Sequence, residues 1–175
     1  MKRAILIFLL IGASLTFLLS CTAGKPPSGH PDTDPQQSGA EQNGSDSALL
    51  KYLEDNSALP CLPGTYLSGV DTDGFELTED GALIIYSSTA FGMTYCFERG
   101  ESADSSRLTE MCFTSVRYAI LGITVGDSPS DAKTVFEASG FKSSQSGNVF
   151  TFTKGSVSVI METTDNKISS VTLRG

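Results

Sequence analysis

The pattern of hydrophobic and polar residues divides the chain into three parts. Residues 4–19 are mostly apolar, residues 22–46 contain no aromatic residue and no Val, Ile, Leu or Met, and residues 47–175 mix apolar and polar positions throughout. Alternation with a period of two is typical of half-buried strands, and a spacing of three to four indicates an amphipathic helix. The third part is therefore expected to be the folded domain, and it is long enough for one hydrophobic core.

The first half of that domain is expected to be one short helix followed by strands. A helix cap at Asp46 or Ser47 precedes apolar residues at helical spacing. These residues are Leu49, Leu50 and Leu53. Four strand-like segments follow, with the turn TEDG between the first two and a phase shift in the fourth that indicates a bulge. The segments are residues 75–77, 83–87, 92–98 and 107–114.

The second half begins with residues 122–128 (GITVGDS) and is expected to hold a helix and three strands. Ser128 suits an N-cap, Pro129 suits the first helical turn, and Asp131 stands three residues after the cap, as in a capping box. Gly140 follows the expected helix end. The apolar helix face is formed by Ala132, Val135 and Phe136, and the strands are residues 149–153, 156–162 and 167–173.

Two segments of the first half align with two of the second. Residues 92–98 (GMTYCFE) align with residues 156–162 (SVSVIME), and residues 107–113 align with residues 167–173. Chance alternation can produce part of this match. The predicted fold class is α+β, with short helices packed on an antiparallel sheet. Its finer form is two degenerate helix–meander repeats, residues 47–118 and 119–175.

The N-terminus has the layout of a secretory signal, with Lys2 and Arg3, a short apolar segment and then Cys21. The apolar segment has sixteen residues, fewer than the roughly 20 that span a bilayer. Its end, LLSC, resembles the lipobox of bacterial lipoproteins. The resemblance implies removal of residues 1–20 and acylation of Cys21, including palmitate-type chains, and two chains are enough for stable anchoring. An ordinary signal peptide or a helical anchor is the alternative.

This resemblance implies a protein anchored by lipid to the extracytoplasmic face of the cell membrane, and Thr22 leaves an outer-membrane location open. Residues 21–46 are then the lipidated cysteine and a disordered tether rich in Pro, Gly and Ser. The single histidine, His30, lies in this tether, so histidine-based triads and zinc sites are not expected. The mature chain has ten basic and twenty acidic residues, which disfavours nucleic acid as a partner.

The second half also carries a family resemblance. Residues 122–128, a short helix, three strands and residues 167–173 (KISSVTL) look like the repeat of the β-lactamase-inhibitor-protein-like group, which includes outer-membrane assembly lipoproteins of the SmpA/OmlA type. The resemblance covers residues 119–175, and only residues 62–64 (LPG) echo it in the first half. It implies a noncatalytic module that binds a partner through its exposed sheet face or loops, and it transfers no functional residue.

Candidate sites in the domain are few. Residues 71–80 are acidic, but Gly74 stands at the fourth position of a calcium loop instead of the sixth, so turn chemistry is favoured and no metal is expected. Cys96 and Cys112 lie on the same face of strands expected to pair, which makes a disulfide reasonable. Three free thiols, or a bond that involves Cys61, are the alternatives.

Aromatic residues supply the remaining candidate. Tyr86, Phe91 and Tyr95 could form a recognition surface or simply belong to the core, and the polar residues 100–106 could form a recognition loop. The expected function is an envelope lipoprotein that acts as a noncatalytic protein-binding module, with an envelope protein as partner, no catalytic residue and no cofactor. The alternative is a lipoprotein that binds a small ligand or glycan for uptake or sensing. An apolar pocket near these aromatics would favour the alternative, and a filled core with a flat open sheet would favour protein binding.

Overall fold

The computed structural model describes the backbone of residues 40–175 and the side chains of residues 46–175. The predicted signal segment, the predicted lipidation site Cys21 and residues 22–39 of the predicted tether, with His30, lie outside the described residues. Among the helices that the structure does describe, none combines the length and apolar character needed to cross a membrane.

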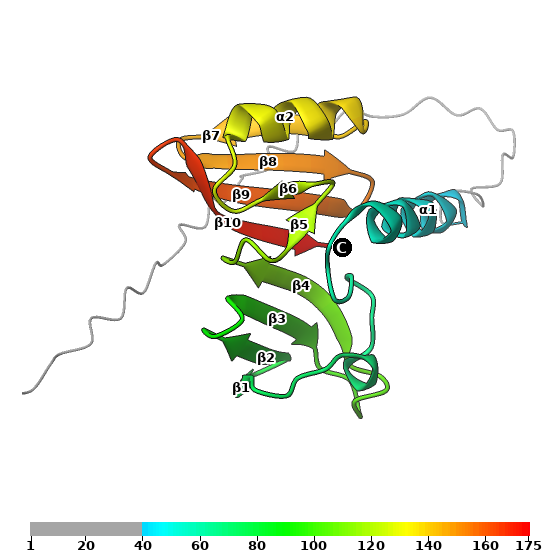
Figure 1. The fold of residues 1–175 in the computed structure, drawn as a ribbon. Coiled ribbons are helices and arrows are strands. Elements are labelled where there is room, and N and C mark those ends of the chain that lie inside the picture. The colour runs from blue at the N-terminus through cyan, green and yellow to red at the C-terminus, as the bar shows by residue number, and fades with distance from the viewer. Residues whose placement is uncertain (1–39) are drawn as a thin grey trace, which may run out of the picture. The chain divides into compact units, whose positions relative to one another are not determined.

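The described residues form two α-helices and one eight-stranded antiparallel sheet (Figure 1). The helices are α1 (Ala40–Asn56) and α2 (Pro129–Ala138). The strands of the sheet are β1 (Glu76–Asp80), β2 (Leu83–Ser88), β3 (Met93–Glu98), β4 (Arg107–Phe113), β7 (Lys142–Ser146), β8 (Val149–Lys154), β9 (Val157–Thr164) and β10 (Lys167–Arg174). Smaller elements are the 3-10 turn η1 (Leu67–Gly69) and the ribbon of β5 (Ala119–Ile120) and β6 (Ile123–Thr124). Helices on an antiparallel sheet agree with the predicted α+β class, although strands predominate.

The sheet consists of two four-stranded meanders side by side, in the order β1-β2-β3-β4-β10-β9-β8-β7 (Figure 1). The first meander, β1 to β4, is green in the figure, and the second, β7 to β10, is orange to red. The two meet where β4 pairs with β10, with Phe113 opposite Val171 and Met111 opposite Leu173. A single pair of strands thus joins the two halves into one continuous sheet.

One face of the sheet carries the core, and we call it the core face. Because successive side chains of a strand point to opposite faces, the buried residues alternate with half-buried ones along β3, β4, β9 and β10. The core face packs against Leu49 and Leu53 of α1, Ala132 and Phe136 of α2, and Ile120 of β5. No helix covers the other face in the described part of the chain, and we call it the open face.

Both helices contact the second meander. Phe136 of α2 stacks on Phe152 of β8, with ring centroids 4.6 Å apart. At α1, the Asp46 carboxylate accepts a hydrogen bond of 3.2 Å from the Ser156 N–H in the turn between β8 and β9. Lys154 lies 6.0 Å from the ring centroid of Tyr52 on the same helix. Near β2 and β3, Figure 1 shows only the short coil of η1 and the loop around it. Leu62, Leu67 and Val70 of this loop pack against the core.

Helix α1 starts earlier than predicted, at Ala40 and not after a cap at Asp46 or Ser47. The sequence AEQ that opens the helix has good helix formers. Asp46 is a helical residue whose carboxylate bonds the backbone of a distant turn and not the first turn of its own helix. The predicted cap at Asp46 is therefore wrong, and residues 40–46, which were predicted as the end of a disordered tether, are helical.

The first hairpin and the outermost strand also differ from prediction. Asp80 pairs with Leu83, so Gly81 and Ala82 make a two-residue turn where the sequence suggested residues 78–81. Gly81 has a φ of +57°, which suits the tight turn. Strand β7 was not predicted, because its sequence KSSQS has no apolar alternation. It forms by pairing with β8, as an edge strand whose residues are mostly exposed.

The two meanders begin from matching turns. Gly64 and Gly126 have φ values of +95° and +94°. The Gly64 N–H donates to the Leu108 carbonyl at 2.7 Å, and the Gly126 N–H donates to the Ile168 carbonyl at 2.8 Å. The residue after each glycine, Thr65 or Asp127, accepts a bond in return from the same strand residue. The inner strands β4 and β10 are thus held by the same local structure.

The inner strands also share a bulge, as the phase shift in residues 107–114 predicted. The pairing of β3 with β4 shifts so that Thr109 has no partner, and the pairing of β9 with β10 shifts at Ser169. The Thr109 hydroxyl donates to the Cys96 carbonyl at 3.1 Å, and the Ser169 hydroxyl donates to the Glu162 carbonyl at 3.1 Å. In each half, a side-chain hydroxyl thus bonds a backbone carbonyl of the neighbouring strand at the point where the bulge disrupts the ladder of backbone hydrogen bonds.

The helices do not match in the same way. Helix α2 follows the Gly126 turn, whereas α1 precedes the Gly64 turn, and the Gly64 turn is followed only by η1. The order of elements is a helix and then a meander in each half, but the two helices occupy different places relative to the shared turn. The positions of the helices therefore do not establish the predicted helix–meander repeat.

Candidate functional site

The open face is the broadest candidate surface. A row of directly paired residues crosses all eight strands there, and nearly all of its members carry small hydroxyl, thiol or aliphatic side chains. From β1 to β7 the row is Glu76, Ser87, Thr94, Cys112, Thr172, Ile160, Thr151 and Ser144. One hollow of about 330 Å³ lies on this row, lined by Ser87, Thr94 and Cys112 among others. The row itself extends over all eight strands, so most of this face suits contact with another surface better than enclosure of a small molecule.

One ion pair lies where the two meanders meet on this face. Glu110 of β4 stands opposite Arg174 of β10, and the Arg174 Nε donates to the Glu110 carboxylate. The Glu110 side chain is 29% exposed and that of Arg174 is 51% exposed, so solvent screens the pair. It helps to set the register between the halves and offers no unpaired carboxylate for acid–base chemistry.

The cysteines proposed for a disulfide lie on the open face as free thiols. Cys96 stands opposite Glu110, and Cys112 stands opposite Thr94, so the two cysteines are diagonal neighbours. Diagonal residues are about 7–8 Å apart, beyond the usual disulfide span of about 4.4–6.8 Å between Cα atoms. A bond would need a shift of the backbone, and the disulfide stays a prediction.

Burial raises the pKa of all three described thiols. The pKa of Cys61 rises to about 11, because burial disfavours the thiolate more than the Tyr95 hydroxyl bond favours it. Burial also raises the pKa of Cys96, with Glu110 adding to the effect, and the pKa of Cys112, where the Thr172 hydroxyl partly opposes it. Reactive cysteines have lowered pKa values, so these thiols are not arranged as nucleophiles.

The predicted recognition aromatics are divided between core and surface. Tyr95 is only 3% exposed and belongs to the core, whereas Phe91 is 36% exposed and Tyr86 is half-buried. Phe75, which the sequence did not single out, stacks between them, with its ring 5.1 Å from that of Tyr95 and 5.5 Å from that of Phe91. Its position at the start of β1, next to a glycine turn, gave no periodic signal. Phe75, Phe91 and Tyr95 thus form one stacked aromatic cluster that is exposed at Phe91.

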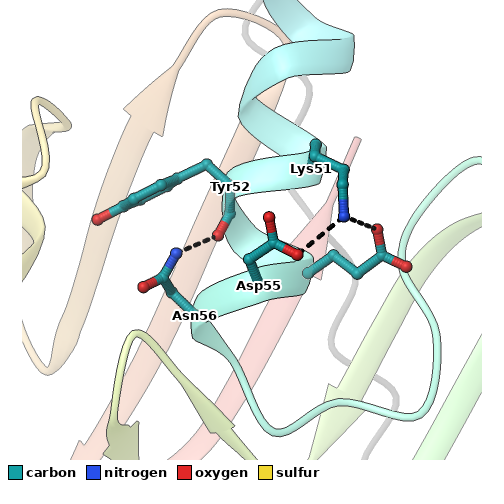
Figure 2. A network of polar contacts seen from close by, with 5 residues as sticks. Lys51, Tyr52, Asp55 and Asn56 are labelled. Carbon is teal, nitrogen blue, oxygen red and sulfur yellow. Dashed lines mark hydrogen bonds and ion pairs between the residues drawn. The ribbon is translucent and has the colours of Figure 1, made fainter.

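A groove of about 750 Å³ lies elsewhere, between α1 and the loop of residues 57–69. Its lining includes Asp46, Lys51, Glu54, Cys61 and Arg107. Figure 2 shows the α1 side of this region, where Lys51 donates to Asp55 at 2.8 Å and to Glu54 at 3.4 Å. These carboxylates, Asp55 first, raise the pKa of Lys51. The groove is polar, and its lysine is already paired.

The acidic stretch forms a turn, as expected. Asp71 accepts a bond of 3.0 Å from the Asp73 N–H, and the Phe75 N–H donates to the Thr72 carbonyl. Gly74 has a φ of +79°. Across the part of the chain that the structure describes, no group of three or more His, Cys, Asp or Glu side chains is placed to hold a metal ion.

The loop of residues 99–106 is held by its own hydrogen bonds. The Ser105 hydroxyl accepts from the Ser102 N–H at 2.9 Å, and the Ser106 hydroxyl accepts from the Gly100 N–H at 3.0 Å. Ser106 is only 1% exposed. A side chain added at Gly100 would collide with Ser105. The loop is compact, so it can present a fixed shape but no flexible reach.

No protein-family model, no curated protein and no solved structure matches this chain.

Proposed function

We propose that this protein is an envelope lipoprotein, anchored through Cys21 on the extracytoplasmic face, that acts as a noncatalytic protein-binding module. The open face of the sheet is the observation that carries the proposal. Its central row of small side chains runs across all eight strands, and no helix of residues 40–175 covers it. An antiparallel sheet needs only one packed face to be stable, and a second face that extends over eight strands fits a protein partner.

The internal symmetry supports the kinship suggested by the sequence with the β-lactamase-inhibitor-protein-like repeat. Gly64 and Gly126 form matching turns, and Thr109 and Ser169 form matching bulges. The residues LPG at 62–64 thus correspond in geometry to TVG at 124–126. We include in the proposal that the domain is a degenerate duplication, with α2 kept in the second half and reduced to η1 in the first.

Binding of a small ligand or glycan is the second candidate, and the groove beside α1 favours it. Its volume of about 750 Å³ falls in the range of ligand sites. However, it contains none of the aromatics Tyr86, Phe91 and Tyr95 that the sequence suggested. Protein binding therefore ranks first.

In-cell photo-crosslinking tests the proposal on the full lipidated chain. A benzoylphenylalanine probe at Thr94 or Thr172, in the middle of the open face, is expected to trap one dominant envelope protein. The matched control carries the probe at Asp165, in the turn after β9, where no contact is expected. Diffuse adducts at every position would contradict protein binding and would favour ligand screening at the groove.

The anchor is tested separately. Replacement of Cys21 by Ser is expected to abolish acylation by labelled palmitate and to release the protein from the membrane fraction. A Cys61→Ser variant is the control, since Cys61 lies inside the folded domain. Retention of the Cys21→Ser protein in the membrane would contradict the lipoprotein assignment.

A further inference from the structure

We infer that the core face of β1 and β2 is a docking site for a basic amphipathic helix of the protein partner. This inference rests on the proposed function and names the chemistry of the partner. The site consists of Leu77, Tyr86 and Ile84 on the two strands, with Phe75 and Phe91 at their end. We call these five residues the β1–β2 patch.

The first step compares the segments that follow the matching glycine turns and pack on the core face of each half. After the Gly126 turn the chain forms the ten-residue helix α2, which is about 15 Å long. After the matching Gly64 turn it forms only the three-residue η1, about 6 Å long. Phe136 of α2 stacks on the second meander, whereas the described residues place only η1 and its loop on the first meander. Leu67 and Val70 of this loop pack against the core but leave Leu77 of β1 exposed.

The second step is the composition of the surface that is left uncovered. Leu77 pairs with Tyr86, and the corresponding pair in the second half is Gln145 with Phe150. Gln145 is exposed, as a glutamine at an edge strand usually is. Leu77 is 52% exposed although it is apolar. Both positions are exposed, but the one in the first half carries an apolar side chain.

The third step is the extent of the patch. Leu77 and Phe91 are exposed, and Tyr86, Ile84 and Phe75 are half-buried. Phe75 stacks on Phe91, and Tyr86 makes an edge contact with Phe97 beneath it, with centroids 6.1 Å apart. The patch is therefore continuous with the core and rigidly supported. Aromatic anchors such as Tyr86 contribute most to the binding energy of interfaces, and an aliphatic neighbour such as Leu77 adds apolar area that binding can bury.

The fourth step is charge. The loop before β1 exposes Asp71 and Asp73, and Glu79 is exposed on the same face of β1 as Leu77. Of these three carboxylates, only Glu79 has a basic partner among the ion pairs of the described residues, namely Arg99 at 3.1 Å. The rim of the patch is therefore net negative. Complementarity calls for Lys or Arg beside the apolar stripe of the incoming helix.

The experiment uses the full lipidated chain in its native envelope, with a photo-crosslinking probe at Leu77 or at Leu83. Leu83 is the matched control, because it lies in the same hairpin, is 39% exposed and points to the open face. The Leu77 probe is expected to label a partner segment with apolar residues at a spacing of three to four and with flanking Lys or Arg. The Leu83 probe is expected not to label that segment.

The labelled segment is then made as a synthetic peptide and titrated against the full chain in detergent. We expect Leu77→Gln, which copies Gln145 of the other half, to weaken binding about tenfold. Leu83→Gln is expected to change it less than twofold. The peptide should gain helical circular dichroism on binding and should bind more weakly at higher salt.

Three results would overturn the inference. The Leu77 probe could label an extended or acidic segment, Leu77→Gln and Leu83→Gln could weaken binding equally, or a partner could be trapped only from the open face. The last result would leave the proposed function intact. If no position on either face traps a single protein, the proposed function fails as well, so the two failures are distinguishable.

Discussion

The two halves of the sheet are alike at their inner strands and different at their outer strands. Strands β4 and β10 share a glycine turn and a hydroxyl-filled bulge. Further out, β8 lies under α2, whereas the part of the chain that the structure describes places only η1 and a loop beside β1 and β2. The inner strands carry the joint between the halves, so their geometry is constrained. The outer strands can diverge without loss of the sheet, and a binding surface can develop there.

The largest expected effect is on the free energy of unfolding, and it should differ between the half that carries α2 and the half that carries η1. Phe136 is fully buried, so Phe136→Ala should lower the free energy of unfolding by about 3–5 kcal/mol. Phe75→Ala, in the half-buried aromatic stack of the first half, should cost about 1–2 kcal/mol. Urea unfolding followed by circular dichroism measures both. Equal costs would mean that the loop of the first half packs as firmly as α2.

The next largest effect on stability tests whether the glycine turns bonded to the inner strands β4 and β10 are equivalent. Gly126→Ala should cost about 1–2 kcal/mol, because its φ of +94° strains any residue with a Cβ, and no other atom is near enough to clash. Gly64→Ala should cost about the same, since its φ is +95° and its nearest neighbour is in ordinary contact. Thermal unfolding of the two variants compares them directly. A large difference would contradict the matching of the turns.

A smaller effect belongs to the second half alone. The Ser128 hydroxyl accepts from the Ser130 N–H at 3.2 Å and caps α2. Ser128→Ala should therefore cost about 1 kcal/mol, measured by urea unfolding. Ser128→Asp is the control, because aspartate is an equally good cap. If Ser128→Ala has no effect, tertiary contacts alone hold the start of the helix.

Leu77→Gln should change the stability of the free protein by less than about 0.5 kcal/mol, because the side chain is half exposed and Gln is already tolerated at the corresponding position of β7. Thermal unfolding checks this. A marked loss of stability would show that Leu77 serves the fold and would weaken its assignment to a docking site.

The smallest expected effect is a difference in alkylation among the thiols of Cys61, Cys96 and Cys112. Because the pKa of Cys61 is raised to about 11, its thiolate is scarce near pH 8, and its alkylation should speed up as the pH rises toward 11. Mass spectrometry of iodoacetamide-treated protein measures this against a denatured control. If Cys96 and Cys112 form the predicted disulfide, only Cys61 will be labelled in the domain before reduction. Labelling of all three would contradict the disulfide.

Most secondary structure could be predicted where local chemistry decides it. Ser128 and Pro129 mark the start of α2 in the sequence. Apolar and polar residues alternate along β3, β4, β9 and β10 because only one face of each strand is buried. Strand β7 could not be predicted, because its polar residues form a strand only through pairing with β8. The start of α1 was misplaced, since Asp46 finds its partner in a turn far along the chain.

The candidate site was less predictable than the fold. Sequence reasoning grouped Tyr86, Phe91 and Tyr95, but Tyr95 is buried, and Phe75 takes its place at the surface. The alignment of the halves was also two residues off in one strand. Met93 pairs with Phe113 while Val159 pairs with Leu173, so Met93 corresponds to Val159 and not to Val157. Alternation alone does not distinguish shifts of two residues, because both keep the same face.

The sequence by itself determined the local features of this protein. Glycines mark the turns that need a positive φ, capping residues mark the start of α2, and alternating apolar residues mark the inner strands. Tertiary structure alone decided that β4 pairs with β10, that both helices contact the second meander and that Leu77 stays exposed. The physical reason is that local signals act through the backbone of a few residues, whereas cover and exposure depend on what the distant parts of the chain bring to each face.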